Sequence, residues 1–233
     1  MSVLVTLAAY NEERNVGRVV RDLRGLRYEC IVVDDGSTDR TAQEALAAGA
    51  VVVSHATNLG QGDALLTGFK VCLLDSECEI IIEMDADGQH DPADVPRFVA
   101  KMRESGADIV VGSRILGSHQ PNASRLRRIF LPYYTGLVNY LTGYTLTDAM
   151  CGFRAFRRDS LARIAPILNI MIEPQYVAAE MFIRFSRAGL CVTEIPIHLG
   201  DRTGGVSRKG AIRYGIGILR AISRTLLDPR LGK

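Results

Sequence analysis

Short apolar runs alternate with longer helix-favouring stretches through the first half of this 233-residue chain, and this alternation constrains the fold more than any other feature. The apolar runs are short, continuous and rich in Val and Ile, which is typical of buried β-strands. They cover residues 3–7, 30–33, 50–53, 80–83 and 109–111. The helix-favouring stretches cover residues 12–26, 41–48, 63–74 and 94–104. This alternation predicts an α/β fold with a mostly parallel sheet flanked by helices.

The second half of the chain is less regular. Residues 125–144 are apolar with a basic start, residues 171–188 favour a helix, and residues 192–197 favour a strand. Residues 209–227 form a clear amphipathic pattern, in which one stripe of the predicted helix is apolar and another carries arginines. We find no linker or repeat, and therefore predict a single domain over residues 1–233.

Charge is distributed unevenly between the two halves of the chain. Residues 1–113 carry 10 Lys/Arg and 19 Asp/Glu, a balance of −9, whereas residues 114–233 carry 18 and 7, a balance of +11. An acidic half suits a metal cation, and a basic half suits phosphates, nucleic acid or an anionic membrane surface. The alternative is two solvated faces of unequal sign.

Several classes of protein are disfavoured by composition. No apolar run has the 18 or more residues of a membrane-spanning helix, and the N-terminus lacks the pattern of a signal peptide. The five cysteines form no Cys-x-x-Cys pair, so we expect reduced thiols in a cytoplasmic compartment. Aromatic residues make up 6% and do not interleave with the arginines, which argues against nucleic acid as a partner.

Polar clusters follow three of the predicted strands. They are Tyr10-Asn11-Glu12, Asp34-Asp35-Gly36-Ser37 and Asp85-Ala86-Asp87. Because ligands of parallel sheets bind beyond the carboxyl ends of the strands, we expect one site built from these three clusters.

Asp85 and Asp87 have the spacing of two carboxylates that share a divalent cation with a diphosphate. The alternative is an acidic turn that caps a helix. Asp34 and Asp35 suit hydrogen bonds to a nucleobase or ribose, and also suit a turn with a helix cap.

Two further loops contain glycine. Residues 58–62 (Asn-Leu-Gly-Gln-Gly) suit a close approach to phosphate or a tight loop before a helix, and Leu65 breaks the dinucleotide-binding fingerprint. Residues 202–209 form a basic loop that suits phosphate recognition, or a solvated turn. No Gly-x-Ser-x-Gly sequence is present, which disfavours a serine hydrolase.

Taken in order, the motifs resemble those of inverting family 2 glycosyltransferases with the GT-A fold. Within that family they are most similar to dolichol-phosphate mannose synthase and related polyprenyl-phosphate hexosyltransferases. The resemblance covers nearly the whole chain and rests on Tyr10-Asn11-Glu12, residues 34–39, 58–62 and 85–92, Gly112-Ser113-Arg114, residues 148–154, Glu180 and residues 202–208. It implies a Rossmann-like sheet with a C-terminal extension on the acceptor side.

The resemblance also implies roles for individual residues. Nucleotide contacts are expected from Ala8, Tyr10, Glu12, Val33, Asp34 or Asp35, Asp85, Ala86 and Asp87. Mg²⁺ or Mn²⁺ is expected on Asp85, Asp87 and Gln89. Phosphate contacts are expected from Arg114, Arg202 and Arg208, and catalytic roles from Asp87, Arg114 and Arg202. Departures from the family pattern are Ala8 in place of proline, Gln61 in place of the frequent lysine, Cys151 in place of a small polar residue and Arg208 in place of lysine.

The implied reaction moves a hexose from a nucleotide sugar to a polyprenyl phosphate, with mannose from GDP-mannose the first choice and glucose from UDP-glucose the second. Such an enzyme is expected to lie peripherally on the cytoplasmic face of a membrane, with residues 125–144 and 209–227 at the membrane surface. The alternative for these two segments is that both helices pack on the sheet with their arginines in water. The alternatives are a family 2 transferase with a soluble hydroxyl acceptor and a nucleotide-sugar-binding module without catalytic activity.

Overall fold

One seven-stranded sheet runs through the computed structural model, which describes residues 2–117, 125–168, 177–200 and 211–228. The strand order is β3-β2-β1-β4-β6-β5-β7. The strands are β1 (Ser2–Ala9), β2 (Glu29–Asp34), β3 (Val51–Ser54), β4 (Cys78–Asp85), β5 (Ile109–Ser113), β6 (Arg154–Arg157) and β7 (Val192–Pro196).

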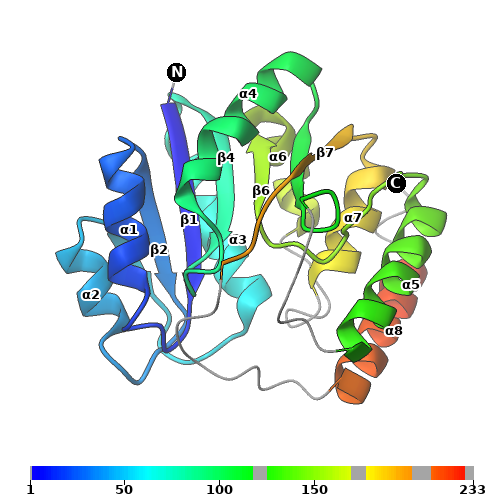
Figure 1. The fold of residues 1–233 in the computed structure, drawn as a ribbon, viewed down its shortest axis with the longest axis horizontal. Coiled ribbons are helices and arrows are strands. Elements are labelled where there is room, and N and C mark those ends of the chain that lie inside the picture. Colours follow the sequence, from blue (N-terminus) through cyan, green and yellow to red (C-terminus); the bar gives the residue numbers. More distant parts are fainter. Residues whose placement is uncertain (1, 118–124, 169–176, 201–210, 229–233) are drawn as a thin grey trace.

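Helices cover both faces of this sheet. They are α1 (Val16–Gly25), α2 (Thr41–Ala47), α3 (Gln61–Leu73), α4 (Val95–Ser105), α5 (Arg125–Thr142), α6 (Arg158–Leu168), α7 (Val177–Arg187) and α8 (Ala211–Leu227), with a short 3-10 helix at Pro92–Asp94. Figure 1 shows α1 and α4 in front of the sheet and α3 and α6 behind it. Helix α7 contacts both α5 and α8, so the second half adds a helical layer beside the sheet.

The pairing of strands confirms the prediction of a mostly parallel sheet. Strand β1 is parallel to β2 and β4, β2 is parallel to β3, and β5 is parallel to β7. Strand β6 is antiparallel to both of its neighbours, β4 and β5. The six strands that we expected are all present.

Strand β6 and helix α6 were missing from our prediction, for a physical reason. The sequence of β6 is Arg-Ala-Phe-Arg, which has no apolar run to reveal it. Arg154 is nevertheless buried, because Glu83 on the adjacent strand β4 lies opposite in the register and pairs with it. Since burial of a charge depends on its partner, and this partner is 71 residues away, local sequence could not indicate the strand.

The register of the parallel strands places the polar clusters together. Ala8 on β1 lies between Val33 on β2 and Asp85 on β4, and Ala9 lies opposite Asp34. The carboxyl ends of these three strands therefore meet at one edge of the sheet, as predicted.

Candidate active site

The loop after β1 is tied to the loop after β2. Asn11 has a left-handed backbone (φ 56°), its N–H donates to Ser37 Oγ at 2.9 Å, and its Oδ1 accepts from the Thr38 N–H at 2.9 Å. The Glu12 N–H donates to Thr41 Oγ1 at 2.8 Å. These bonds hold the two loops side by side and leave the Tyr10 side chain 39% exposed at the edge of the sheet.

Asp35 holds a third loop to the same edge. Its buried carboxylate lies 2.8 Å from His55 Nδ1 and accepts from the main-chain N–H groups of Leu59 (3.0 Å) and Gly60 (2.9 Å). The carboxylate of Asp34 accepts from the Ser37 N–H at 3.1 Å. Both aspartates that we expected near the nucleotide therefore shape the loops at this edge of the sheet.

At Gly36, the main chain of the loop after β2 lies close to the main chain of residues 57–58. Its φ is +69°, and a Cβ at this position would lie 2.4 Å from the carbonyl carbon of Thr57. Glycine is thus required where the loop after β2 meets residues 57–58. Val33, the remaining expected contact on this strand, is fully buried in the sheet.

The expected metal ligands lie in the loop that follows β4. Asp85 and Asp87 are half-buried, whereas Ala86 between them is buried. Asp87 Oδ1 accepts from the Gln89 N–H at 3.0 Å, and Asp85 Oδ1 lies 3.4 Å from Gln61 Nε2 of α3. The first half of the chain thus brings two carboxylates to the same edge as Tyr10.

His90 stabilises this loop as a neutral side chain. Burial lowers its pKa to about 4, and its Nδ1 accepts from the Asp85 N–H at 3.2 Å. Its ring stacks on Phe153 with centroids 5.0 Å apart. This histidine links the Asp85 loop to the loop before β6.

The carboxylates of Asp85 and Asp87 suit a hard divalent cation. Among the described residues no group of three or more His, Cys, Asp and Glu side chains forms a metal cluster. Two carboxylates from one loop match the way Mg²⁺ is held when substrate phosphates complete its coordination. Gly152 closes the site from the second half, because a Cβ there would lie 3.2 Å from Asp85 Oδ2.

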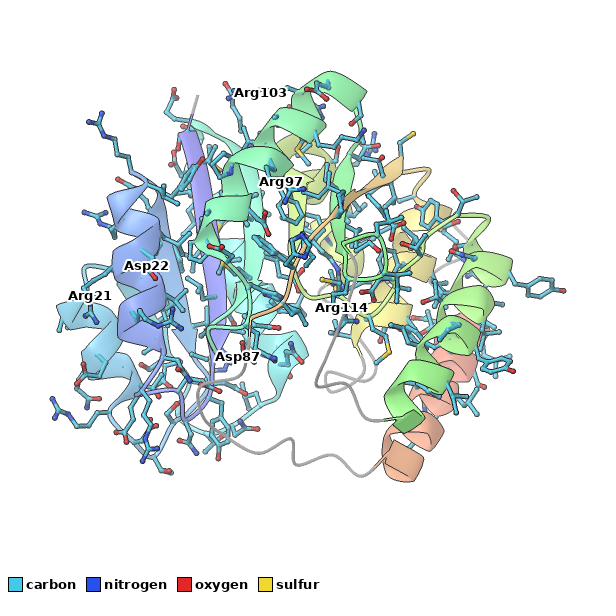
Figure 2. All side chains as sticks on the ribbon, in the orientation of Figure 1. Arg21, Asp22, Asp87, Arg97, Arg103 and Arg114 are labelled. Carbon is cyan, nitrogen blue, oxygen red and sulfur yellow. The ribbon has the colours of Figure 1, made fainter. Side chains whose placement is uncertain are left out.

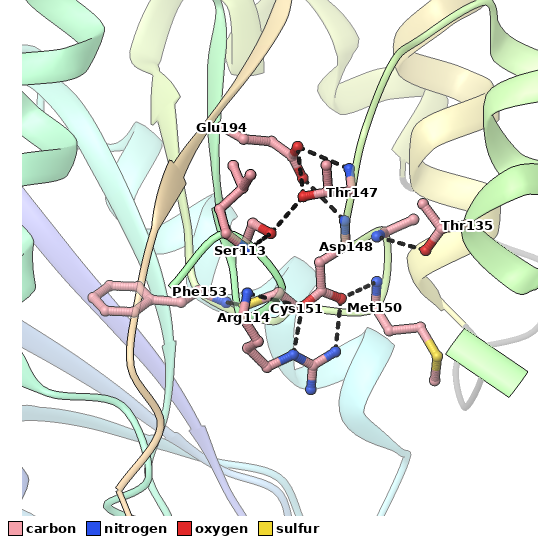
Figure 3. A network of polar contacts seen from close by, with 11 residues as sticks. Ser113, Arg114, Thr135, Thr147, Asp148, Met150, Cys151, Phe153 and Glu194 are labelled. Atoms are coloured by element: carbon pink, nitrogen blue, oxygen red, sulfur yellow. Dashed lines mark hydrogen bonds and ion pairs between the residues drawn. The ribbon is translucent and has the colours of Figure 1, made fainter. Parts of the chain in front are cut away.

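Arg114 follows β5 and is paired with Asp148. Its Nε and Nη2 donate to the two carboxylate oxygens of Asp148 at 2.5 and 2.7 Å, and its main-chain N–H donates to Oδ2 at 3.1 Å. Burial lowers the pKa of Arg114, but its bond to Asp148 and the charge of that carboxylate outweigh this and raise the pKa above its usual value. Figure 3 shows the third guanidinium nitrogen, Nη1, pointing away from Asp148.

The predicted catalytic residues Asp87 and Arg114 lie toward the same end of the molecule. Figure 2 labels both toward the end to which the tips of β1 and β2 point, and labels Arg103 at the opposite end. Arg202 and Arg208 lie outside the described residues. The last described residue before them is Gly200, whose N–H donates to the main-chain oxygen of Gln89 at 2.8 Å.

The sequence did not indicate the residues that hold Arg114 in place, either directly or through a neighbouring residue. Asp148 is 34 residues away, and Glu194 of β7, which accepts from the Thr147 and Asp148 main chain, is farther still. The motif at residues 148–154 indicated a functional loop, but nothing in its spacing indicated that Asp148 would pair with Arg114. The arginine of that motif, Arg154, is buried against Glu83 at 3.4 Å.

The sequence is similar to those of known proteins over most of its length. It is 36% identical over 222 residues to an uncharacterized protein of Methanocaldococcus jannaschii, covering 93% of this chain and 89% of that one. It is 31% identical over 217 residues to a protein of Micrococcus luteus named undecaprenyl-phosphate mannosyltransferase, covering 89% and 87%.

The fold is also similar to that of a solved structure. Glucosyl-3-phosphoglycerate synthase from Mycobacterium tuberculosis, crystallised with Mn²⁺, UDP-glucose and phosphoglyceric acid, superposes with a TM-score of 0.71 at 23% identity, over 95% of this chain and 80% of that one. The GT-A fold predicted from the motifs is confirmed. Residues 4–165 match the family described as glycosyl transferase family 2, which is more than half of the chain. The protein belongs to glycosyl transferase family 2.

Proposed function

We propose that this protein transfers a hexose from a nucleotide sugar to a polyprenyl phosphate. One observation carries the proposal: two carboxylates suited to a divalent cation and one paired, permanently charged arginine lie toward the same end of the sheet. The loop at residues 148–154 joins them, because Asp148 holds Arg114 and Gly152 lies against Asp85. A site of this kind can hold a sugar diphosphate beside a second anion. The name of the Micrococcus luteus relative supports a lipid phosphate as that anion.

The reaction follows from the chemistry of the acceptor. An oxygen of the lipid phosphate attacks the anomeric carbon, the bond from that carbon to the diphosphate breaks, and the electron pair leaves with the nucleoside diphosphate. The configuration at this carbon inverts. A phosphate monoester has a second pKa near 6, as for a phosphorylated side chain, so it is mostly dianionic at pH 7 and needs no strong general base.

The residues of the chain would then bind and orient the two anions. Asp85, Asp87 and Gln89 would hold Mg²⁺ or Mn²⁺ at the diphosphate, and Tyr10 would contact the base. The ion, when bound, supplies Lewis-acid stabilisation of the leaving group. Arg114 would direct Nη1 at a phosphate, since a fixed cation in a buried site stabilises developing negative charge without rearrangement.

Membrane contact would bring the protein to its acceptor. The outer face of α5 exposes Ile129 (61%), Tyr133 (77%) and Tyr140 (86%), and α8 exposes Leu219 (57%) and Leu227 (81%). Residues 125–142 and 211–227 contain six arginines and no Asp or Glu. No helix within the described ranges has the length and apolar character needed to cross a membrane. We propose that α5 and α8 lie peripherally on the anionic, cytoplasmic face of a membrane.

The test is direct transfer. Purified protein is incubated with polyprenyl phosphate, Mg²⁺ or Mn²⁺ and a panel of labelled nucleotide sugars, led by GDP-mannose and UDP-glucose. We expect label in the organic phase, and we expect flotation with anionic liposomes that is weakened by high salt. Label transferred only to water-soluble hydroxyl acceptors would replace the lipid acceptor, and donor binding without turnover on any acceptor would indicate a binding module.

A further inference from the structure

The carboxylate of Glu194 holds a turn that belongs to a distant part of the chain. Its Oε2 accepts from the Thr147 N–H at 2.8 Å and from the Thr147 hydroxyl at 3.0 Å, and its Oε1 accepts from the Asp148 N–H at 3.1 Å (Figure 3). Two consecutive main-chain N–H groups on one carboxylate leave the turn little freedom to rotate.

The same turn holds the arginine of the proposed phosphate site. Asp148 is fully buried and accepts both the guanidinium and the main-chain N–H of Arg114. The Ser113 hydroxyl lies 2.5 Å from the Thr147 hydroxyl and closes the ring of contacts. The direction of the Arg114 guanidinium plane is therefore set by the position of the Thr147–Asp148 main chain.

Strand pairing places Glu194 where it can set that position. Glu194 lies opposite Val111 in the parallel β5–β7 register, three residues before Arg114. The anchor and the arginine are thus carried by the same strand pair. We propose that Glu194 is a positioning residue, which fixes the Thr147–Asp148 turn and through it the direction in which Arg114 presents Nη1. The inference rests on the proposed role of Arg114 in binding phosphate.

The opposite end of the same strand pair offers a matched control. Asp108, just before β5, accepts from the Cys191 N–H, just before β7, at 2.8 Å, and its other oxygen accepts from the Ser160 hydroxyl. Like Glu194, this carboxylate accepts from a main-chain N–H of a segment distant in sequence, but it lies at the end of the strand pair away from Arg114. Asp108→Ala should therefore reproduce any general loss of stability without moving the arginine.

The experiment compares Glu194→Ala, Glu194→Gln and Asp108→Ala in the full chain. The Nε–H signal of Arg114 is observed by NMR after labelling with ¹⁵N-arginine, and it is identified by its loss in Arg114→Lys. Kinetics with polyprenyl phosphate and the nucleotide sugar give KM for each substrate and kcat. Glu194→Gln keeps one oxygen for Thr147 but turns an amide N–H toward the Asp148 N–H, so its effect should be intermediate.

We expect Glu194→Ala to shift the Arg114 Nε–H signal and speed its exchange with water, and to raise KM for polyprenyl phosphate about tenfold, the effect of one or two lost hydrogen bonds. The KM for the donor should change less than about twofold. An unchanged Arg114 signal, or equal changes in Asp108→Ala, would overturn the inference. If Glu194→Ala does not fold, the same comparison is made with Glu194→Gln. If the unmodified protein transfers no sugar to the lipid, the proposed function fails, whereas the NMR comparison still decides the role of Glu194.

Discussion

The two halves of the molecule build their parts of the site in different ways. In the first half, carboxylates accept from main-chain N–H groups, within a turn at Asp34 and Asp87 and between loops at Asp35. In the second half, polar side chains are matched over long distances in sequence, as in Arg114 with Asp148 and Arg154 with Glu83. Hydrogen bonds to main-chain N–H groups suffice where strand ends already converge, whereas the irregular region uses buried ion pairs to define its shape.

Within the described ranges, the buried arginines all belong to the second half. Arg184 on α7 pairs with Glu180 at 2.6 Å and lies 3.5 Å from Asp228, the residue that follows α8. All three are buried. Because removing one member of such a group leaves another charge in a dry environment, we expect this half to tolerate substitution of its polar residues poorly.

The largest expected effect concerns Arg154, whose partner belongs to the other half. Arg154→Met leaves the Glu83 carboxyl buried without its cation, which should lower the free energy of unfolding by about 3–5 kcal/mol. Urea denaturation measures the loss. Arg157→Met is the control and should cost much less, because Arg157 lies on the same strand but is half-buried, and its guanidinium donates to the Ala107 carbonyl at 3.3 Å. Equal losses would show that the pair contributes nothing beyond packing.

The loss of stability in Arg154→Met should depend on pH. Burial raises the pKa of Glu83 to about 7 even with Arg154 beside it, so the folded protein binds this proton more tightly than the unfolded chain does. A raised folded-state pKa adds stability below the unfolded value near 4.5 and loses it as pH rises through the folded value. Arg154→Met raises the folded pKa further, so its loss of stability should be smaller at pH 5 than at pH 8.

The next effect tests the proposed metal site in the first half of the chain. Asp87→Ala should lower kcat/KM about 10²–10³-fold, as for removal of one electrostatic contact to a transition state. Asp75→Ala is the matched control, because Asp75 accepts from the N–H two residues later at 2.8 Å in the same kind of turn, at the start of β4 instead of its end. Wild-type turnover in Asp87→Ala with metal present would remove the metal assignment.

A smaller effect is expected where the halves touch. Gly152→Ala adds a Cβ 3.2 Å from Asp85 Oδ2, so the carboxylate must move by a few tenths of an ångström. The Mn²⁺ concentration for half-maximal activity should rise about tenfold, the usual size of a disturbed ligand orientation. Gly25→Ala, where a Cβ meets nothing within 4 Å, should leave the metal requirement unchanged. An unchanged requirement in Gly152→Ala would mean that Asp85 adjusts freely.

The smallest effect concerns Arg158 of the second half, which caps the C-terminus of helix α3 in the first half. Arg158 at the start of α6 donates to the Asp75 and Leu73 carbonyls at 3.1 and 3.2 Å, at the C-terminus of α3. Arg158→Ala should lower the free energy of unfolding by about 1–2 kcal/mol, because two hydrogen bonds to a helix end are lost. Arg163→Ala, exposed on the same helix, should cost less than about 0.5 kcal/mol. A loss no larger than that control would mean that water replaces Arg158.

Most of the sheet, and the edge at which the polar clusters meet, could be predicted from sequence. Strands β1 to β5 and β7 contain apolar runs that local pattern detects, and the clusters at Tyr10, Asp34 and Asp85 follow strand ends directly. The pattern failed at β6 and α6. Two of the four β6 residues are arginines, and α6 contains Pro166.

Sequence alone determined the alternation of strands and helices, the edge at which the carboxylates gather and the family to which the motifs point. The alternation and the edge depend on periodicity and on turn residues within a few positions of each other, whereas the family follows from the resemblance of the motifs. Only the tertiary structure decided that Arg114 is held by Asp148, that Asp148 is held in turn by Glu194, and that Arg154 lies inside the sheet. A charge is stable in a buried place only beside its partner, and folding alone brings together partners that lie tens of residues apart.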